Sequence, residues 1–324
     1  MFRIDDSTAA TSLPVPEAAG SEGYFTEGSP TTGTPATNVR GSWLNMIQEE
    51  LCAILAAAGI ARSKTTYNQV NSALQKMYAP VVGTMRNGSM SVPAASATAT
   101  FTADEILVAT ALGGQSYKLA SFSKTINLAT TGAGGMDTGV APASGFVAIY
   151  AIYSPTTQTA ALLATNASSA VQPNVYAGSN MPAGYAASAL VSVWRTDSSS
   201  QFVAGAQVDR KVYQPPVNIF SISTQTSVPA SFGISGAVPK NARSYDGIIQ
   251  AAFTTAGAGV NANVCSSTAG IAQKGFSTVA AAASGQEAES FTDLPILTSQ
   301  TSYYTLATTS GASTITVFVT AYQF

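Results

Sequence analysis

Apolar side chains recur at alternating spacings of three and four residues between positions 42 and 60. The positions that carry this pattern are Leu44, Ile47, Leu51, Ile54 and Ala58. Such spacing predicts an α-helix with one narrow apolar stripe. Ser42 is expected to cap the start of this helix with its hydroxyl. Gly59 is expected to end it, because glycine tolerates the left-handed conformation that closes a helix.

The stripe has two interpretations. A stripe confined to the a and d positions of a heptad is typical of a coiled-coil seam or a small bundle. The stripe covers only two heptads, which is too short to exclude the second interpretation, an ordinary amphipathic helix within one monomer. The flanking segments favour assembly, because the segment before the helix lacks periodicity and the chain after it alternates like strands. We therefore predict that these five side chains form a trimerisation seam.

Residues 1–40 are rich in Gly, Pro, Ser and Thr and have no apolar periodicity. Such a segment buries too little apolar surface to offset the entropy that it loses on ordering. It does contain isolated apolar side chains, namely Phe2, Ile4, Leu13, Val15, Tyr24 and Phe25. We expect an extended arm that becomes ordered on a partner; the alternative is a flexible tail.

A second, shorter helix is expected after residue 65. Thr66 and Gln69 have the spacing of a capping box. The apolar stripe that follows consists of Val70, Ala73, Leu74 and Met77. Pro80 is expected to end the helix. Residues 41–79 are therefore predicted to form a two-helix collar.

Five short motifs follow one another in this region. They are GYFT at 23–26, PAT at 35–37, WLNMIQEEL at 43–51, AAGI at 57–60 and TYNQ at 66–69. In this order they make residues 1–79 resemble the N-terminal region of tail-fibre proteins of tailed bacteriophages, those of Mu-like and other temperate phages of Gram-negative bacteria in particular. The resemblance implies a homotrimeric fibre that attaches to the phage baseplate. The expected attachment residues are Phe2, Tyr24, Phe25 and Trp43.

From residue 81 the pattern changes to a period of two, which predicts β-strands. The first group of expected strands covers 81–86, 89–93, 98–102, 105–110, 116–128, 146–153, 158–164, 189–196 and 201–213. Asn87-Gly88 is a typical hairpin turn between the first two. Residues 146–153 are apolar on both faces, so we expect a central strand that is buried on both sides.

The prolines Pro215 and Pro216 mark an expected domain boundary, because neither can donate a hydrogen bond to a sheet. Further strands are expected at 217–223, 230–234, 245–254, 270–280, 289–297, 303–307 and 314–322. Many short strands without helices between them favour antiparallel sandwiches. The predicted fold is mainly β, with two jelly-roll-like β-sandwich domains at 80–214 and 215–324 that follow the arm and collar of a homotrimer.

Composition narrows the possible functions. Charged residues make up 9% of the chain, against roughly 25% in a typical soluble domain, which favours a surface that faces other copies or carries Thr, Ser and Asn. The chain has no histidine, the commonest metal ligand and general base. Basic residues are not clustered, which argues against nucleic acid. We expect no enzyme activity, no metal and no cofactor.

Signal peptides and membrane-spanning segments indicate where a protein is located. The N-terminus lacks a cationic start followed by an apolar run, so no signal peptide is expected. The longest apolar stretch, at 145–153, is too short to span a bilayer as a helix, so no membrane insertion is expected. Cys52 is expected to be a small buried apolar residue. We predict synthesis in the host cytoplasm and incorporation into the virion, at the tail and baseplate.

The candidate sites are a phosphate-binding loop, a pair of acids for sugar cleavage and an aromatic receptor surface. Gly132–Gly135 precedes no helix and lacks the P-loop lysine, so it is not expected to hold phosphate. Asp137 and Glu287 are candidates for sugar cleavage, but the chain lacks the repeats of a β-helix depolymerase. Aromatic side chains suit a receptor surface better; the candidates are Tyr245, Tyr303 and Tyr304.

The function predicted from these patterns is structural and adhesive. The N-terminus would attach a fibre to the baseplate, and the C-terminal β domains would contact a glycan or protein of the host surface. Two alternatives stay open. One is a proximal fibre or baseplate component that docks a separate receptor-binding protein, and the other is a depolymerase of surface polysaccharide.

Overall fold

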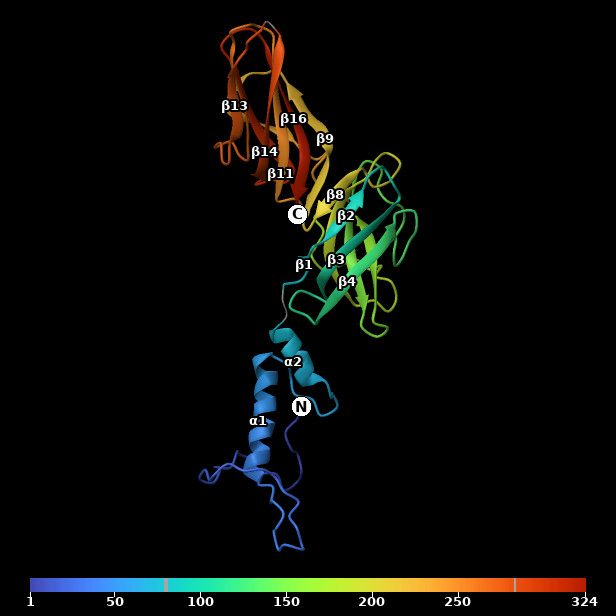
Figure 1. Ribbon diagram of the computed structural model, residues 1–324, viewed down its shortest axis with the longest axis vertical. Helices are drawn as coiled ribbons and strands as arrows, with labels where there is room; N and C mark the ends of the chain where they lie inside the picture. Colours follow the sequence, from blue (N-terminus) through green and yellow to red (C-terminus); the bar gives the residue numbers. More distant parts are fainter. Residues whose placement is uncertain (79–80, 283) are drawn as a thin grey trace. The chain divides into compact units, whose positions relative to one another are not determined.

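A computed structural model of the protein describes residues 1–78, 81–282 and 284–324. The chain divides into two compact units, Met1–Ala79 and Pro80–Phe324 (Figure 1). The described part of the chain is mainly β, with antiparallel sheets and two helices. Pro80, which we expected to end the second helix, lies outside the described residues.

The first unit is built on the two helices, α1 (Gly41–Ala57) and α2 (Gln69–Met77). They lie against each other through Cys52 and Leu55 of α1 and Ala73 of α2, which are all buried. The burial of Cys52 confirms its expected role as a small apolar residue. Residues 1–40 contain one isolated bridge, between Ser29 and Thr34, and otherwise follow no regular secondary structure.

The end of α1 is the one predicted. Gly59 has a φ of +63°. Its amide donates to the Ala56 carbonyl at 3.0 Å, and the Ile60 amide donates to the Leu55 carbonyl at 2.9 Å. This pair of hydrogen bonds is a Schellman motif, in which a left-handed residue lets the chain satisfy the last carbonyls of the helix. The prediction for Gly59 is confirmed.

The start of α1 differs from the prediction. The helix begins at Gly41, with Arg40 in the cap position and no side-chain cap. The Ser42 hydroxyl donates instead to Glu17 Oε1 at 3.0 Å. Arg40 binds the same carboxylate oxygen at 2.9 Å, so the ion pair brings an acceptor to Ser42. The N-cap prediction for Ser42 is wrong because the arm supplies a stronger, charged partner.

The capping box expected at α2 is also wrong. Asn68 precedes the helix without a side-chain cap. The Gln69 side chain is buried instead and bonds to the preceding turn. Its Nε2 donates to the Ala61 carbonyl at 2.7 Å, and its Oε1 accepts from the Ser63 amide at 3.0 Å. Gln69 therefore satisfies backbone groups of the turn between the helices, and Thr66 has no part in this.

The second unit consists of antiparallel strands (Figure 1). They are β1 (Met85–Arg86), β2 (Ser89–Val92), β3 (Thr98–Ala109), β4 (Ser116–Asn127), β5 (Phe146–Ser154), β6 (Thr159–Asn166), β7 (Ala187–Arg195), β8 (Gly205–Val208), β9 (Lys211–Ile222), β10 (Thr226–Gly233), β11 (Ser244–Phe253), β12 (Gly259–Cys265), β13 (Lys274–Val279), β14 (Gly285–Pro295), β15 (Thr301–Thr308) and β16 (Ser313–Gln323). One sheet follows the order β14-β11-β16-β9-β8-β2-β3-β7-β5-β6, with β1 and β4 also paired to β3. The other follows β10-β15-β12-β13.

The strand β5 is central, as predicted. It pairs with β6 on one side and β7 on the other, and all but one of its residues are buried. Two large polar side chains in this core bond to backbone carbonyls. The Tyr150 hydroxyl donates to the Pro173 carbonyl at 2.8 Å, and the Trp194 Nε1 donates to the Val203 carbonyl at 3.0 Å. The prediction of a strand buried on both faces is confirmed.

Asn87-Gly88 is not a hairpin turn. The strands on either side of it, β1 and β2, both pair with β3, so the chain continues in one direction. Asn87 has a φ of +53°, and its Nδ2 donates to Asp104 Oδ2 at 2.6 Å. Asn tolerates the left-handed region because its short polar side chain bonds locally. Here that conformation makes a kink in a strand. The two strands expected within 98–110 likewise form one strand, β3.

The prolines Pro215 and Pro216 lie inside β9 rather than between elements. The pairing of β9 with β16 shifts register between Val319 and Ala321, opposite the prolines. A bulge of this kind accommodates residues that cannot donate to the ladder. β9 also pairs with β8. The single strand β9 therefore connects the strands before the prolines with those after them. The domain boundary at 214/215 stays a prediction.

The four-stranded sheet meets the longer sheet through buried contacts. Tyr245 of β11 donates from its hydroxyl to Ser302 Oγ of β15 at 2.9 Å. β12 was not predicted from the sequence, because Asn261 and Asn263 interrupt its apolar pattern. Its alternate residues, such as Val260, are buried. The jelly-roll-like sandwiches and the homotrimer stay predictions.

Candidate functional site

Exposed apolar side chains concentrate in the first unit. Among the described residues, 24 large hydrophobic side chains are exposed; 14 of them belong to residues 1–78 and 10 to the much longer remainder. Within residues 1–78, the buried apolar side chains are only Cys52, Leu55, Ala58 and Ala73. Contiguous exposed apolar surface marks an interaction site in a folded protein. The first unit is therefore the candidate assembly surface.

The predicted trimerisation residues divide into two groups. Leu44 and Ile47 have exposed fractions of 54% and 36%. Leu51 and Ile54 are half-buried, and Ala58 is buried between the helices of its own chain. The first half of the stripe is thus available to a partner, whereas its last residue is occupied within the subunit. Their role in trimerisation stays a prediction.

Met46 extends this exposed surface and was not included in the stripe. Its exposed fraction is 55%, and it lies three residues after Trp43, beside Ile47. Residues three apart on a helix are neighbours on its surface. The spacing from Trp43 could therefore have indicated Met46. We call Trp43, Leu44, Met46 and Ile47 the α1 patch.

Of the four predicted attachment residues, the structure brings two together. The rings of Phe25 and Trp43 pack edge to face, with centroids 4.9 Å apart and planes at 77°. Tyr24, next to Phe25, is almost fully exposed. Phe2 is also exposed but lines a separate cavity near the turn between the helices. Phe25 and Trp43 thus form a pair at the start of α1, Tyr24 adjoins the pair in sequence, and Phe2 lies elsewhere.

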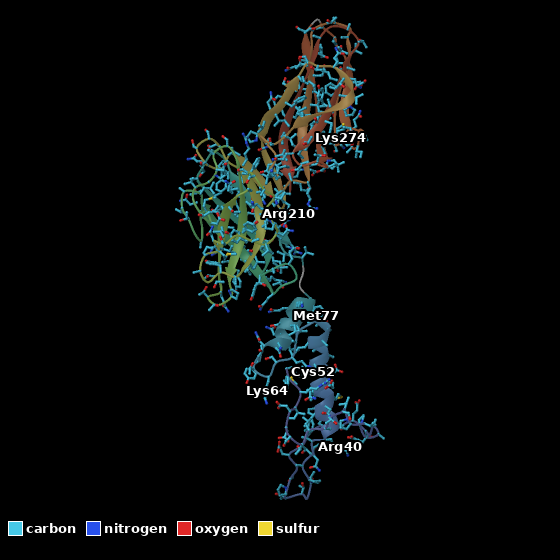
Figure 2. All side chains as sticks on the ribbon, turned by 180° about the vertical axis from the view of Figure 1, so that it is seen from behind. Arg40, Cys52, Lys64, Met77, Arg210 and Lys274 are labelled. Carbon is cyan, nitrogen blue, oxygen red and sulfur yellow. The ribbon has the colours of Figure 1, made fainter. Side chains whose placement is uncertain are left out.

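Ion pairs hold the arm within the first unit. Two of the cations are labelled in Figure 2: Arg40 binds Glu17 at 2.9 Å, and Lys64 binds Asp5 at 2.7 Å. The hydrogen bond from Lys64 lowers the pKa of Asp5. Exposed pairs of this kind contribute little each. They orient the arm within one subunit, and its aromatic side chains are left facing solvent.

The start of the arm forms one wall of a cavity of about 490 Å³. The opposite wall comes from the segment before α2 and its first turn, with Tyr67, Gln69 and Val70 among the lining residues. Phe2 and Ile4 supply apolar surface from the arm. Its size lies within the range of roughly 300–1,000 Å³ typical of small-ligand sites. It is the place where the predicted attachment residue Phe2 lies.

Two of the three predicted receptor residues are in the core. Tyr245 and Tyr304 have exposed fractions of 1% and 4%, and only Tyr303 is partly exposed. The Tyr304 ring packs against Phe220, with centroids 4.9 Å apart. Burial raises the pKa of the Tyr245 phenol. Successive side chains of a strand point to opposite faces of the sheet. Tyr304 therefore lies on the inner face of β15, and its neighbour Tyr303 lies on the outer face.

The glycine-rich segment uses its amides within the protein. Gly132 donates to the Met136 carbonyl at 2.8 Å, Gly134 to the Leu162 carbonyl at 2.7 Å, and Gly135 to the Gly132 carbonyl at 2.9 Å. A phosphate cradle needs several free backbone amides that point at one anion. These three amides are occupied, and the segment is fixed against β6.

The candidate acids lie in different settings. Glu287 and Glu289 are exposed on β14 and face the same side, as solvated acids do. The Tyr176 hydroxyl donates to Asp137 Oδ2 at 2.9 Å. Burial and this hydrogen bond raise the pKa of Tyr176 to about 12. Within residues 1–78, 81–282 and 284–324, no group of three His, Cys, Asp or Glu side chains is arranged to hold a metal.

The described part of the chain contains the helices α1 and α2. Neither of its helices combines the length and the apolar character needed to cross a bilayer.

Comparison with known proteins gives one local similarity. No family model matches the chain. The chain is 40% identical over 77 residues to the uncharacterized protein StfP of Escherichia coli (strain K12). This match covers 24% of the chain and 35% of the relative, so it spans about a third of that protein's length.

The chain also has a weak likeness to the solved structure of the infectious bursal disease virus Gx strain. It covers 76% of this chain and 74% of its own at 10% identity, with a TM-score of 0.20. A likeness at that score carries no argument about fold or function.

Proposed function

We propose that the protein is a structural and adhesive tail-fibre protein of a tailed bacteriophage, and that it works as a homotrimer in the virion. The observation that carries the proposal is the α1 patch, an apolar helix surface in a unit that buries few side chains of its own. The tail-fibre resemblance of residues 1–79 supports it. The relative StfP comes from a Gram-negative bacterium, which agrees with that resemblance.

The residue types along the stripe favour more than two strands. The spacing places Leu44 and Leu51 at a positions and Ile47 and Ile54 at d positions. In parallel coiled coils, Leu at a with Ile at d shifts the preference from dimers to trimers and tetramers. Exposed apolar surface stabilises such an assembly by roughly 25 cal/mol for each Å² that leaves water. The helix is short, so the neighbouring Trp43 and Met46 would add to the contact.

A trimer would make weak contacts effective. Three receptor sites on one fibre convert the second and third binding events into intramolecular ones. In this arrangement the first unit joins the copies and attaches them to the baseplate, while the second unit contacts the host surface. The low proportion of charged residues, 9%, agrees with a surface that is partly covered by other copies.

The mass of the full-length protein in solution tests the proposal. We expect light scattering at micromolar concentration to give three times the chain mass of 32.9 kDa. The double variant Leu44→Ser/Ile47→Ser should shift the protein toward monomer, because it removes the exposed half of the stripe. Leu112→Ser, a change at a similarly exposed leucine in the second unit, is the matched control. A wild-type monomer would contradict the proposal.

A further inference from the structure

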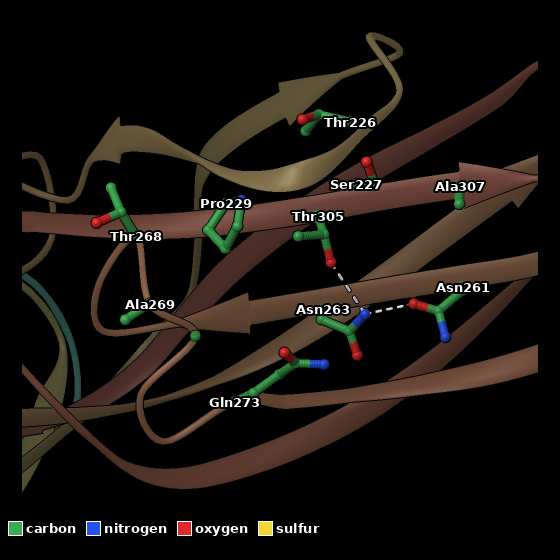
Figure 3. A pocket seen from close by; sticks show the side chains of 11 residues that line it. Thr226, Ser227, Pro229, Asn261, Asn263, Thr268, Ala269, Gln273, Thr305 and Ala307 are labelled. Atoms are coloured by element: carbon green, nitrogen blue, oxygen red, sulfur yellow. Dashed lines mark hydrogen bonds between the residues drawn. The ribbon is translucent and has the colours of Figure 1, made fainter.

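The outer face of the four-stranded sheet carries a polar groove (Figure 3). Its cavity has a volume of about 450 Å³, within the range of roughly 300–1,000 Å³ typical of ligand sites. The strand β12 forms its floor through Asn261 and Asn263, which point away from the core. Thr305 of β15 lies directly opposite Asn263. These three strand residues bring side-chain amides and a hydroxyl to one surface.

A hydrogen-bond ladder fixes the floor. Asn263 Nδ2 donates to Thr305 Oγ1 at 3.0 Å and also to Asn261 Oδ1. Asn261 Nδ2 in turn donates to Ser277 Oγ of β13 at 2.6 Å. The ladder thus crosses β15, β12 and β13 and holds the amides in defined orientations. Such a polar network is pre-organised, so little side-chain freedom is lost when a ligand binds.

One acceptor of this floor is left for a ligand. Both hydrogens of Asn263 Nδ2 are used, whereas no donor among the described residues bonds to its Oδ1. Asn263 is only 7% exposed. Gly275 keeps this oxygen clear, because a Cβ at that position would lie 2.3 Å from Asn263 Oδ1. Asn263 Oδ1 does not belong to the fully buried unpaired atoms of the described residues, so a ligand or water can reach it and supply a hydrogen.

The walls contain hydroxyls, amides and small apolar groups. Thr226, Ser227 and Pro229 come from β10, and Thr268, Ala269, Gly270 and Gln273 from the loop before β13. Among the described residues, no charged side chain lines the groove. A charged ligand would therefore lose its hydration without gaining an ion pair. The chemistry of the walls matches a neutral ligand that carries many hydroxyls.

The groove continues along the sheet. A second cavity of about 470 Å³ shares Asn261 and Ala307 with the first and extends to Val279 and Thr309. The four steps along β12 from Asn263 back to Gly259 span about 13 Å at the usual rise per strand residue. The second cavity has a larger apolar share, with Val260 and Val279 among its lining residues. An elongated site with polar and apolar portions suits a chain of sugar rings.

We propose that this groove binds a neutral oligosaccharide of the host cell surface. Hydroxyls of the sugar donate to Asn263 Oδ1 and bond with Thr305 and Gln273, while the aliphatic faces of the rings pack on Pro229 and Ala307. The proposal deepens the adhesive function proposed above and rests on it for the source of the ligand. It assigns recognition to amides and hydroxyls instead of the buried tyrosines.

The test uses the intact full-length protein and defined probes. A panel of neutral oligosaccharides of hexoses and N-acetylhexosamines is titrated by calorimetry, with sialylated oligosaccharides of equal length as charged comparisons. We expect binding of a neutral member and weaker binding of its sialylated form. Thr305→Val with Gln273→Ala should lower the affinity about tenfold, the effect of losing one or two hydrogen bonds.

Thr316→Val is the matched control. Thr316 lies on a strand of the other sheet, and its hydroxyl also has a side-chain partner, Ser221 at 3.1 Å. It should bind as the wild type does, and thermal melts should show that all variants fold. Equal affinity of the groove variant and the control would overturn the proposal.

Two further results separate this proposal from the proposed function. Failure to bind any oligosaccharide by a protein that scatters as a trimer would overturn the groove and leave the assembly standing. A monomer that still binds through Thr305 and Gln273 would overturn the proposed assembly and leave the groove proposal standing. If Ala307→Arg, which places a charge in the groove, lowered the mass of the assembly, a neighbouring copy would occupy the site and the saccharide proposal would be wrong.

Discussion

Buried tyrosine hydroxyls in the second unit each depend on a single acceptor. Tyr322, at the end of β16, is fully buried and donates to the Val193 carbonyl of β7 at 2.8 Å. Tyr245 donates to Ser302. Burial raises the pKa of both phenols, because the ionised form would lose its hydration. These contacts join strands that are far apart in the sequence, so their protonation matters for the fold.

The raised pKa values predict a loss of stability at high pH. In the unfolded chain a tyrosine has a pKa of about 10. Below that pH both states hold the proton and the contribution is complete. As the pH rises above it, the unfolded chain releases the proton and the folded protein does not, so the free energy of unfolding falls. Urea unfolding on both sides of pH 10, followed by circular dichroism, should show this fall.

The variant Tyr322→Phe isolates one group. It removes the titrating phenol and leaves the Val193 carbonyl without its donor, which should cost about 1–3 kcal/mol at neutral pH. The remaining alkaline loss should be smaller than in the wild type. Tyr303→Phe, at a partly exposed neighbour of the core, should change neither quantity by as much. An alkaline loss of the same size in Tyr322→Phe would contradict the assignment.

Among the elements, those with strong apolar periodicity were predictable. β16 alternates buried Ile315, Val317 and Val319 with partly exposed residues, as its sequence indicates. β12 was missed because its outward residues are asparagines, which a sequence pattern associates with turns. Their amides pair with Ser277 and Thr305 on neighbouring strands. Such partners come from tertiary pairing, which no local pattern reveals.

The helix starts were missed for a related reason. Local sequence position predicts Ser42 and Gln69 as capping residues. In the structure the Ser42 side chain bonds to Glu17, and the Gln69 side chain bonds to the Ala61 carbonyl. The end of α1 was predictable because it depends on one backbone conformation at Gly59. At the candidate site, the apolar spacing identified Leu44 and Ile47, which are exposed. The sequence also suggested Tyr304 as a receptor residue, but Tyr304 is buried. Its inward position depends on which face of β15 meets the core.

The end of α1 can be tested by replacing Gly59 with alanine. Its φ of +63° is strained for any residue with a Cβ, although the nearest atom to a Cβ there is 3.8 Å away. We expect a loss of about 1 kcal/mol from backbone strain alone. Gly23→Ala, at a position without a positive φ and with open space, should be neutral. Helical circular dichroism of the full-length variants during thermal melting measures the difference.

The whole molecule combines two different surfaces. The first unit exposes large apolar groups from the arm and α1, whereas the groove of the second unit is lined by uncharged polar groups. The first kind of surface suits association between proteins, and the second suits a hydrated ligand. Under the proposed function, the first unit would join the copies and the groove would hold the receptor. Assembly and adhesion are then separable by mutation.

Attachment to the phage particle should depend on the aromatic cluster at the start of α1. Tyr24 is 98% exposed beside the Phe25–Trp43 pair, and it touches little within its own chain. The double variant Tyr24→Ser/Phe25→Ser should therefore keep the fold and the mass of the assembly, because it leaves Leu44 and Ile47 unchanged. It should fail to join particles that lack their own copy, since buried aromatic side chains dominate protein interfaces.

Tyr78→Ser provides the control for that experiment. Tyr78 is 77% exposed in the same unit but lies after α2, away from the Phe25–Trp43 pair in sequence. Particles purified by density gradient and probed for the protein should contain the Tyr78 variant at wild-type level and the arm variant at a small fraction of it. If the arm variant were incorporated normally, attachment would have to lie elsewhere, and the cavity lined by Phe2 would be the next candidate.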